Sequence, residues 1–158
     1  MSENHERSSF SDHQARILAE VLDAIIPPSA DGLLPGAGRI DLAGAIEDAL
    51  RQTPEVLAMI VQGLSSLDEL ARRRGSQDFT ALHETDRREV MEELASSQDA
   101  FPPVLILQTF AAYYRSQRVL EELGLEARAP HPSGYAVEPN NFALLDAVRR
   151  RPPFYRQC

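Results

Sequence analysis

The sequence contains no lysine, no tryptophan and only one cysteine among its 158 residues. Because the single thiol belongs to the last residue, Cys158, the chain can form neither an internal disulfide nor a zinc site with several cysteine ligands. The net charge of −8 opposes binding to nucleic acid, since that binding depends on basic side chains that displace counterions from phosphates. We therefore expect no nucleic-acid partner.

Long apolar segments are also absent. The densest apolar run, VLILQTFAAYY, is about half the length that crosses a bilayer, and the N-terminal MSENHERSSFSDH lacks the basic and then apolar pattern of an export signal. We therefore expect no transmembrane segment and a cytoplasmic location. Hydrophobic residues make up 43% and charged residues 25% of the chain, which predicts a single folded domain.

The alternating pattern of β-strands does not occur, whereas helical spacing recurs along the chain. In FSDHQARILAEVLDAII the apolar residues fall on one helical face. Ser11 and Gln14 have the form of a capping box, in which each side chain satisfies a free amide at the helix start. The sequence therefore predicts a first helix that begins after Ser11 and ends before Pro27 and Pro28, because proline does not fit a helix interior.

Four further helices are expected from the same spacing. The second has Asp41 as its N-cap, and the third has Thr53 as its N-cap and ends before Gly75. A fourth buries Val90, Met91 and Leu94, and a fifth runs from Pro102-Pro103 to Gly124 and is apolar on every side in its first half. We predict an all-α fold, a bundle of about five helices over residues 11–124, after a flexible N-terminus of residues 1–10.

The composition changes after this bundle. Residues 125–141 are rich in proline, which is unfavourable inside helices. We therefore predict an extended C-terminal arm over residues 125–158. A short helix is expected within the arm, through FALLDAV, with Asn141 as its N-cap.

One glycine-rich segment, PPSADGLLPGAGRID, raises the question of a phosphate-binding loop. Such a loop presents glycine amides at a helix N-terminus, in patterns that follow a strand or include a lysine. Gly36 and Gly38 follow a helix instead, and no lysine is present. The sequence favours a tight connector between two helices, with Asp31 or Asp41 capping.

No constellation typical of catalysis or metal binding is found. The four histidines are scattered and lack the spacing of metal ligands, and the glutamates near residue 90 lie beside arginines, as on a solvated helix. Ser133 has no upstream glycine to form a nucleophile elbow, and no base can be assigned to the terminal thiol. We predict no catalytic, cofactor-binding or metal-binding residue in this chain.

Aromatic and arginine side chains are concentrated in two places, the fifth helix and the arm. Tyrosine and arginine are enriched at interface hot spots, because each buries a large area and keeps a polar end to pair. The alternative is that these side chains fold back on their own bundle. The candidate interface residues are Phe110, Tyr113, Tyr114, Arg118, His131, Tyr135 and Tyr155.

Two segments, LAEVLDAIIPPSADGLLPGAGRIDLAGAIEDAL and FTALHETDRREVMEEL, resemble the gluconate 2-dehydrogenase subunit 3 family, and the resemblance covers roughly residues 14 to 140. It implies a non-catalytic small subunit that stabilises or matures an FAD-dependent oxidoreductase of the glucose-methanol-choline type. The large partner would hold the FAD and oxidise an alcohol or a sugar. Many relatives carry a twin-arginine export signal, which the N-terminus of this sequence does not show, so a cytoplasmic complex is expected.

Three other hypotheses remain at this point. The chain could be a stand-alone helical module that binds a small apolar ligand or regulates an enzyme. It could be an enzyme that uses His131 and Tyr135 in a cleft beneath the arm. Finally, the arm could reach the partner's substrate entrance and shape access to it, and a crosslink from Cys158 would locate it.

Overall fold

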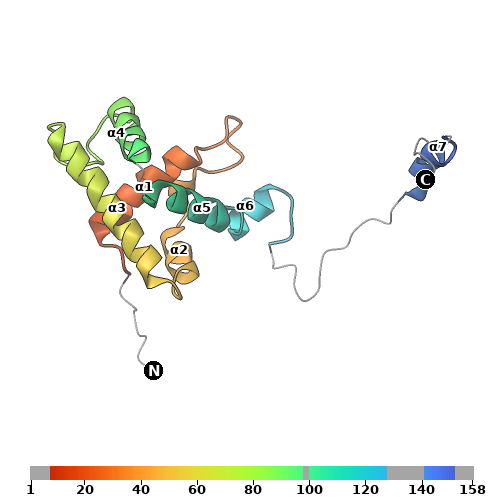
Figure 1. The fold of residues 1–158 in the computed structure, drawn as a ribbon, viewed down its shortest axis with the longest axis horizontal. Coiled ribbons are helices and arrows are strands. Elements are labelled where there is room, and N and C mark those ends of the chain that lie inside the picture. Colours follow the sequence, from red (N-terminus) through yellow and green to blue (C-terminus); the bar gives the residue numbers. More distant parts are fainter. Residues whose placement is uncertain (1–7, 98–99, 128–140, 152–158) are drawn as a thin grey trace, which may run out of the picture. The chain divides into compact units, whose positions relative to one another are not determined.

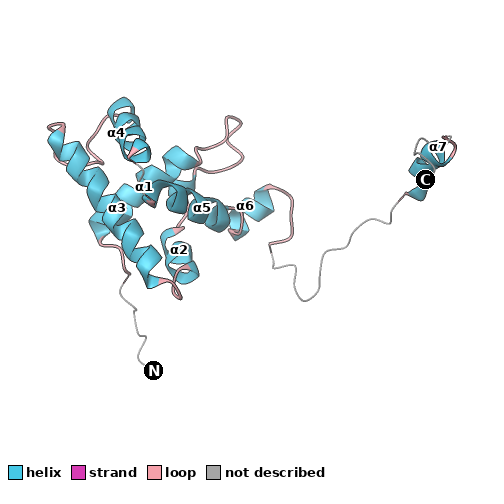
Figure 2. Ribbon diagram, in the orientation of Figure 1, coloured by secondary structure: helices cyan, strands magenta, loops and turns pink. Residues whose placement is uncertain are grey.

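The computed structural model describes residues 8–97, 100–127 and 141–151, and no strand occurs among them, so the all-α prediction is confirmed (Figures 1 and 2). The chain divides into two compact units, Met1–Ala127 and Arg128–Cys158, close to the predicted end of the bundle. The first unit contains the elements α1 (Asp12–Ile25), η1 (Ala37–Arg39), α2 (Ala43–Ala49), α3 (Pro54–Arg73), α4 (Glu84–Ser96), α5 (Phe101–Tyr113) and α6 (Gln117–Glu122). No helix in the described ranges has the length and apolar character needed to cross a membrane.

Helix α1 forms as the sequence predicts. The Ser11 side chain accepts a hydrogen bond from the Gln14 amide, and the Gln14 side chain accepts one from the Ser11 amide, which completes the capping box. The helix ends at Ile25, before the two prolines. Its inner face is formed by four buried side chains, those of Ile17, Leu18, Val21 and Leu22.

The glycine-rich connector is held against α1 by its backbone. Asp23 on α1 accepts a hydrogen bond from the Gly38 amide, with 2.8 Å between Oδ1 and nitrogen. A Cβ atom at Gly38 would overlap the carbonyl oxygen of Ala19, and one at Gly36 would overlap the Asp23 carboxylate. Only glycine permits this close approach. The amide that a phosphate would need is therefore already bonded to a carboxylate, and the prediction of a tight connector is confirmed.

Neither of the two aspartates suggested as caps in this connector is the N-cap of a helix, and the bonds of Asp31 close a turn within the connector instead. Asp31 accepts hydrogen bonds from the Ser29 hydroxyl and the Leu33 amide, and these bonds lower the pKa of its carboxyl below the ordinary value of 3.8. Asp41 is not the N-cap of α2, which corrects the prediction. That position belongs to Leu42, which has no side-chain cap bond. Leu42 is buried, so core packing rather than capping decides where the helix begins.

Helix α3 lies against α1, α4 and α5. Ile60, Leu64 and Leu67 are buried along its length, as the apolar stripe predicts. Thr53 is at the N-cap position, but its hydroxyl makes no cap bond and instead donates to the Leu50 carbonyl. Gly75 follows the helix with φ of +86°, the left-handed conformation predicted for it.

A buried carboxylate, Asp68, joins three parts of the body. Its Oδ1 accepts a hydrogen bond from the Phe79 amide at 2.9 Å, and its Oδ2 accepts one from Arg72 and lies 3.0 Å from Nε2 of His13. A buried carboxylate without partners would be strongly destabilising. Here the charge is satisfied, and it fixes Phe79 in the core ahead of α4.

The predicted fifth helix is two helices. Helix α5 ends at Tyr113, and α6 begins after Ser116, whose backbone is extended with ψ of 130°. The break has a tertiary cause, since the Tyr113 hydroxyl donates to the carbonyl of Pro35 at 2.7 Å, and Val119 turns back into the core. Gly124 follows α6 with φ of +70°, as predicted.

The second unit is described only over residues 141–151. It contains η2 (Phe142–Leu145) and α7 (Asp146–Arg149). The Asn141 side chain accepts a hydrogen bond from the Ala143 amide, so the predicted cap is confirmed. The remaining residues of the predicted arm, 128–140 and 152–158, and residues 1–7 of the N-terminus lie outside the described ranges.

Candidate functional site

The outward face of α5 carries no charge. We call it the outward stripe, and its residues recur at helical spacing and are all exposed: Pro103, Ile106, Leu107, Phe110, Ala111 and Tyr114. At 1.5 Å per residue the stripe extends about 16 Å along the helix. The rings of Phe110 and Tyr114 stack within it, with 6.2 Å between their centroids. An apolar surface of this length, exposed to water, is typical of a protein that binds another protein.

The inner face of the same helix is enclosed by the core. Phe101, Leu105 and Thr109 are buried there, and so is Tyr113, whose exposed fraction is only 1%. Burial raises the pKa of the Tyr113 hydroxyl, followed in effect by neighbouring Tyr114, so the group stays protonated and continues to donate to Pro35. The structure therefore places Tyr113 in the core and not on the surface.

The other residues suggested for an interface fall into two groups. Phe110 and Tyr114 belong to the outward stripe, and Arg118 is exposed on α6. His131, Tyr135 and Tyr155 lie outside the described residues. Of the described residues in this set, Tyr113 therefore belongs to the core, Phe110 and Tyr114 to the outward stripe, and Arg118 to the exposed surface of α6.

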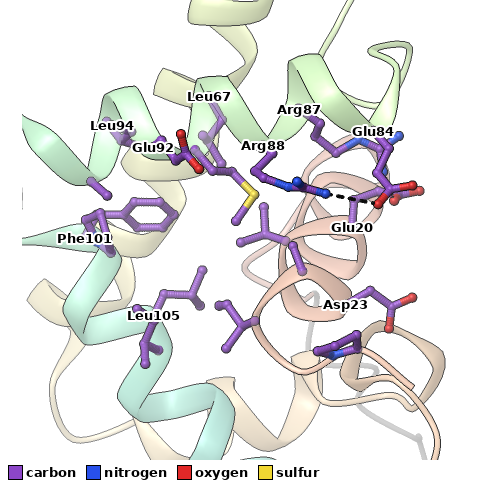
Figure 3. A pocket seen from close by; sticks show the side chains of 18 of the residues that line it. Glu20, Asp23, Leu67, Glu84, Arg87, Arg88, Glu92, Leu94, Phe101 and Leu105 are labelled. Atoms are coloured by element: carbon purple, nitrogen blue, oxygen red, sulfur yellow. Dashed lines mark hydrogen bonds and ion pairs between the residues drawn. The ribbon is translucent and has the colours of Figure 1, made fainter. Parts of the chain in front are cut away.

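A groove of about 880 Å³ opens between α1, α4 and α5, and Figure 3 looks into it. Its floor is apolar and consists of side chains that also belong to the core: Val21, Leu67, Leu94, Phe101 and Leu105. Met91 of α4 lines one wall and is only partly buried. Pro102 and Ile106 of α5 line the opposite wall, so the groove continues into the outward stripe at Ile106.

The rim of the groove carries charged side chains that pair with one another. Arg87 of α4 binds Glu20 of α1, and Nη2 of Arg87 also donates to the Leu82 carbonyl at 3.0 Å. The next arginine along α4, Arg88, lies 3.4 Å from Glu84, as the dashed line in Figure 3 marks. These partners neutralise the charge of each arginine at the rim.

Glu92, one turn beyond Arg88 on α4, is the exception at the rim. It is exposed, and it has no ion pair or hydrogen bond from its side chain within the described part of the chain. Its neighbours Glu89 and Glu93 both bind Arg74, at 3.1 and 2.9 Å. The groove therefore has an apolar floor and one unneutralised negative charge at its edge.

The described residues contain no group of three or more histidine, cysteine, aspartate or glutamate side chains that could hold a metal ion. His13 is bonded to Asp68, and Nδ1 of His83 lies 3.2 Å from the Thr85 hydroxyl. The carboxylates that line the groove include several already bound to arginines. This arrangement suits the binding of an apolar surface.

Sequence reasoning did not find the groove. Its walls come from three helices, and one of its ion pairs joins Glu20 to Arg87, which lie 67 positions apart. The only local signal is the apolar character of α5 on all sides, which indicated that more than the core must cover this helix.

A scan against protein families matches residues 12–131 to gluconate 2-dehydrogenase subunit 3. The match includes every helix from α1 to α6, both the outward stripe and the groove, and ends before α7. No curated protein and no solved structure matches the chain significantly. Because the match extends over most of its length, this helical chain belongs to the gluconate 2-dehydrogenase subunit 3 family.

Proposed function

We propose that the chain is a non-catalytic accessory subunit that stabilises or matures an FAD-dependent large subunit of the glucose-methanol-choline oxidoreductase type. That partner holds the FAD and oxidises an alcohol or a sugar, while this chain contributes a binding surface. Membership of a family described as a dehydrogenase subunit supports a larger oxidoreductase partner.

The outward stripe of α5 is the observation that carries the proposal. Ile106, Leu107, Phe110 and Tyr114 are between 43% and 65% exposed, although the opposite face of the same helix is buried. A helix that is apolar on all sides is normally enclosed on all sides. Covering these four half-exposed side chains would contribute about 1 kcal/mol for each of them. Such a surface accounts for a stable complex without any catalytic group in this chain.

The test is coexpression of the chain with its flavoprotein. We expect the two polypeptides to elute together from a sizing column, with FAD absorbance and dehydrogenase activity in the same fraction. The double variant Leu107→Gln/Phe110→Gln should lose at least tenfold in affinity, because two polar amides replace apolar side chains at the centre of the interface. Ala58→Gln, an exposed change on α3, is the matched control and should bind normally.

A stand-alone binding module predicts a different result. In that case the purified chain is a monomer, no flavoprotein accompanies it at native abundance, and turnover by the flavoprotein does not depend on it. This outcome would overturn the accessory role. Activity of the chain alone towards an alcohol or a sugar would overturn the non-catalytic assignment.

A further inference from the structure

We infer that the groove between α1, α4 and α5 binds an amphipathic helix of the large subunit, whose apolar face fills the groove and whose basic side chain pairs with Glu92. This inference rests on the proposed function, because it assigns the groove to the same partner that covers the outward stripe. It adds a second contact, and it specifies the secondary structure and the charge of the partner segment.

The shape of the groove supports a helix as its occupant. Helix α3 lies against α1, α4 and α5, and the groove opens between the last three helices on one side of this arrangement. In helical bundles such a position is filled by a further helix, and an amphipathic helix of a partner can enter a groove of this kind with its apolar face inward. The volume of about 880 Å³ accommodates several large side chains rather than one.

The floor of the groove is closely packed, and one wall carries a side chain that can adopt several conformations. The ring of Phe101 lies directly on α3 at Gly63, where a Cβ atom would overlap the ring, so glycine allows Phe101 to form part of the floor. Phe101 and Leu105 are both almost fully buried. Met91 on the α4 wall is flexible and partly exposed, and methionine adapts well to the shape of an apolar partner.

The charges at the rim of the groove favour a partner segment with a basic side chain. Arg87 and Arg88 are paired with acids of this chain, so the occupant does not have to bring a carboxylate to that part of the rim. Glu92 remains without a partner in the described part of the chain, and a lysine or arginine on the occupant would neutralise it. A second copy is disfavoured, because each copy has a net charge of −8.

Continuity with the outward stripe selects the large subunit as the source of this helix. Ile106 belongs both to the stripe and to the wall of the groove, and Pro102 lines the same wall. A partner that covers the stripe as far as Pro103 therefore also extends to the mouth of the groove. One surface of the large subunit can satisfy both features.

The experiment fills the groove and changes its charge in the full chain. Ala95→Trp and Ala24→Trp place a large ring at exposed positions of the lining, and each should weaken binding to the purified large subunit at least tenfold. Ala58→Trp, exposed on α3, should bind like the wild type. Glu92→Arg leaves the groove open and should weaken binding about threefold to tenfold, with the difference largest at low salt.

Hydrogen exchange on the complex supplies a second readout. We expect one helical peptide of the large subunit, with apolar residues at helical spacing on one face and a basic residue beside that face, to become protected by the wild-type chain and to lose that protection with Ala95→Trp. The thermal midpoint of each variant is measured first, and Glu92→Arg tests the inference independently if the tryptophan variants unfold.

Different failures are separable. If Leu107→Gln/Phe110→Gln abolishes binding while Ala95→Trp and Glu92→Arg bind normally, the accessory role stands and the groove assignment is wrong. If the wild-type chain does not bind the flavoprotein at all, both proposals are wrong. A native mass spectrum of the complex with a small apolar molecule bound in this chain, or a dimer lost with Ala95→Trp, would also overturn the helix assignment.

Discussion

The surroundings of α1 differ from the outer face of α5 in how their side chains are accommodated. Around α1 the polar groups form hydrogen bonds within the chain. Asp23 accepts a hydrogen bond from the Gly38 amide, and Asp68 accepts one from the Phe79 amide. On the outer face of α5, apolar side chains meet water and nothing in the described part of the chain covers them. The difference predicts that changes to these polar contacts around α1 lower the stability of the isolated chain, whereas changes to the outer face of α5 affect the proposed complex.

Gly38→Ala is expected to have the largest effect on stability. The added methyl group would overlap the Ala19 carbonyl, so the connector has to move away from α1, and the free energy of unfolding should fall by about 3 kcal/mol. Urea denaturation followed by circular dichroism measures the change. Gly44→Ala is the control, because a Cβ atom there meets no neighbour and alanine favours helix α2. Equal stability of the two variants would contradict the rigid packing of the connector.

Asp68→Ala tests the second polar contact of the α1 side. The change leaves the buried Phe79 amide without an acceptor and removes the partner of Arg72 and His13, so the free energy of unfolding should fall by roughly 2 kcal/mol. Glu69→Ala, at the next position of α3, is the control. Glu69 is exposed and lies 3.9 Å from Arg73, and its loss should change stability by less than about 0.5 kcal/mol. A similar small change for Asp68→Ala would show that the network is not structural.

Leu107→Gln tests the outer face of α5 and should lower the stability of the isolated chain less than Gly38→Ala or Asp68→Ala. Leu107 is 65% exposed, so its replacement should change the free energy of unfolding by less than about 0.5 kcal/mol, even though we propose that the same position contributes to partner binding. The denaturation midpoint of the isolated chain and its affinity for the flavoprotein are measured together. Destabilisation comparable to that of Asp68→Ala would mean that the stripe belongs to the chain's own core.

Local signals in the sequence predicted much of the fold. The Ser11 and Gln14 capping box, the left-handed Gly75 and the buried stripe of α3 depend on residues within a few positions of one another, and each was found as predicted. The connector was also identified correctly, because proline and glycine restrict the backbone in a way that the sequence shows directly.

The remaining features depend on contacts between distant residues. The break after α5 follows from the bond between Tyr113 and Pro35, which are 78 positions apart, and the start of α2 follows from the burial of Leu42. The groove has the same origin, since it forms only when three helices meet. Among the candidate interface residues, residue type alone did not separate Tyr113 from Tyr114. Adjacent positions on a helix point about 100° apart, so one of two neighbouring tyrosines can be buried while the other is exposed.

The bond between Tyr113 and Pro35 has a consequence for assembly. It fastens the C-terminal end of α5 to the connector, so in the proposed complex the orientation of the stripe depends on Pro35, which lies outside the stripe. A proteolytic cut or an insertion near Pro35 would therefore reduce complex formation while every interface side chain stayed intact. If the proposed complex forms, the connector therefore sets the orientation of its binding surface although it supplies none of the stripe residues.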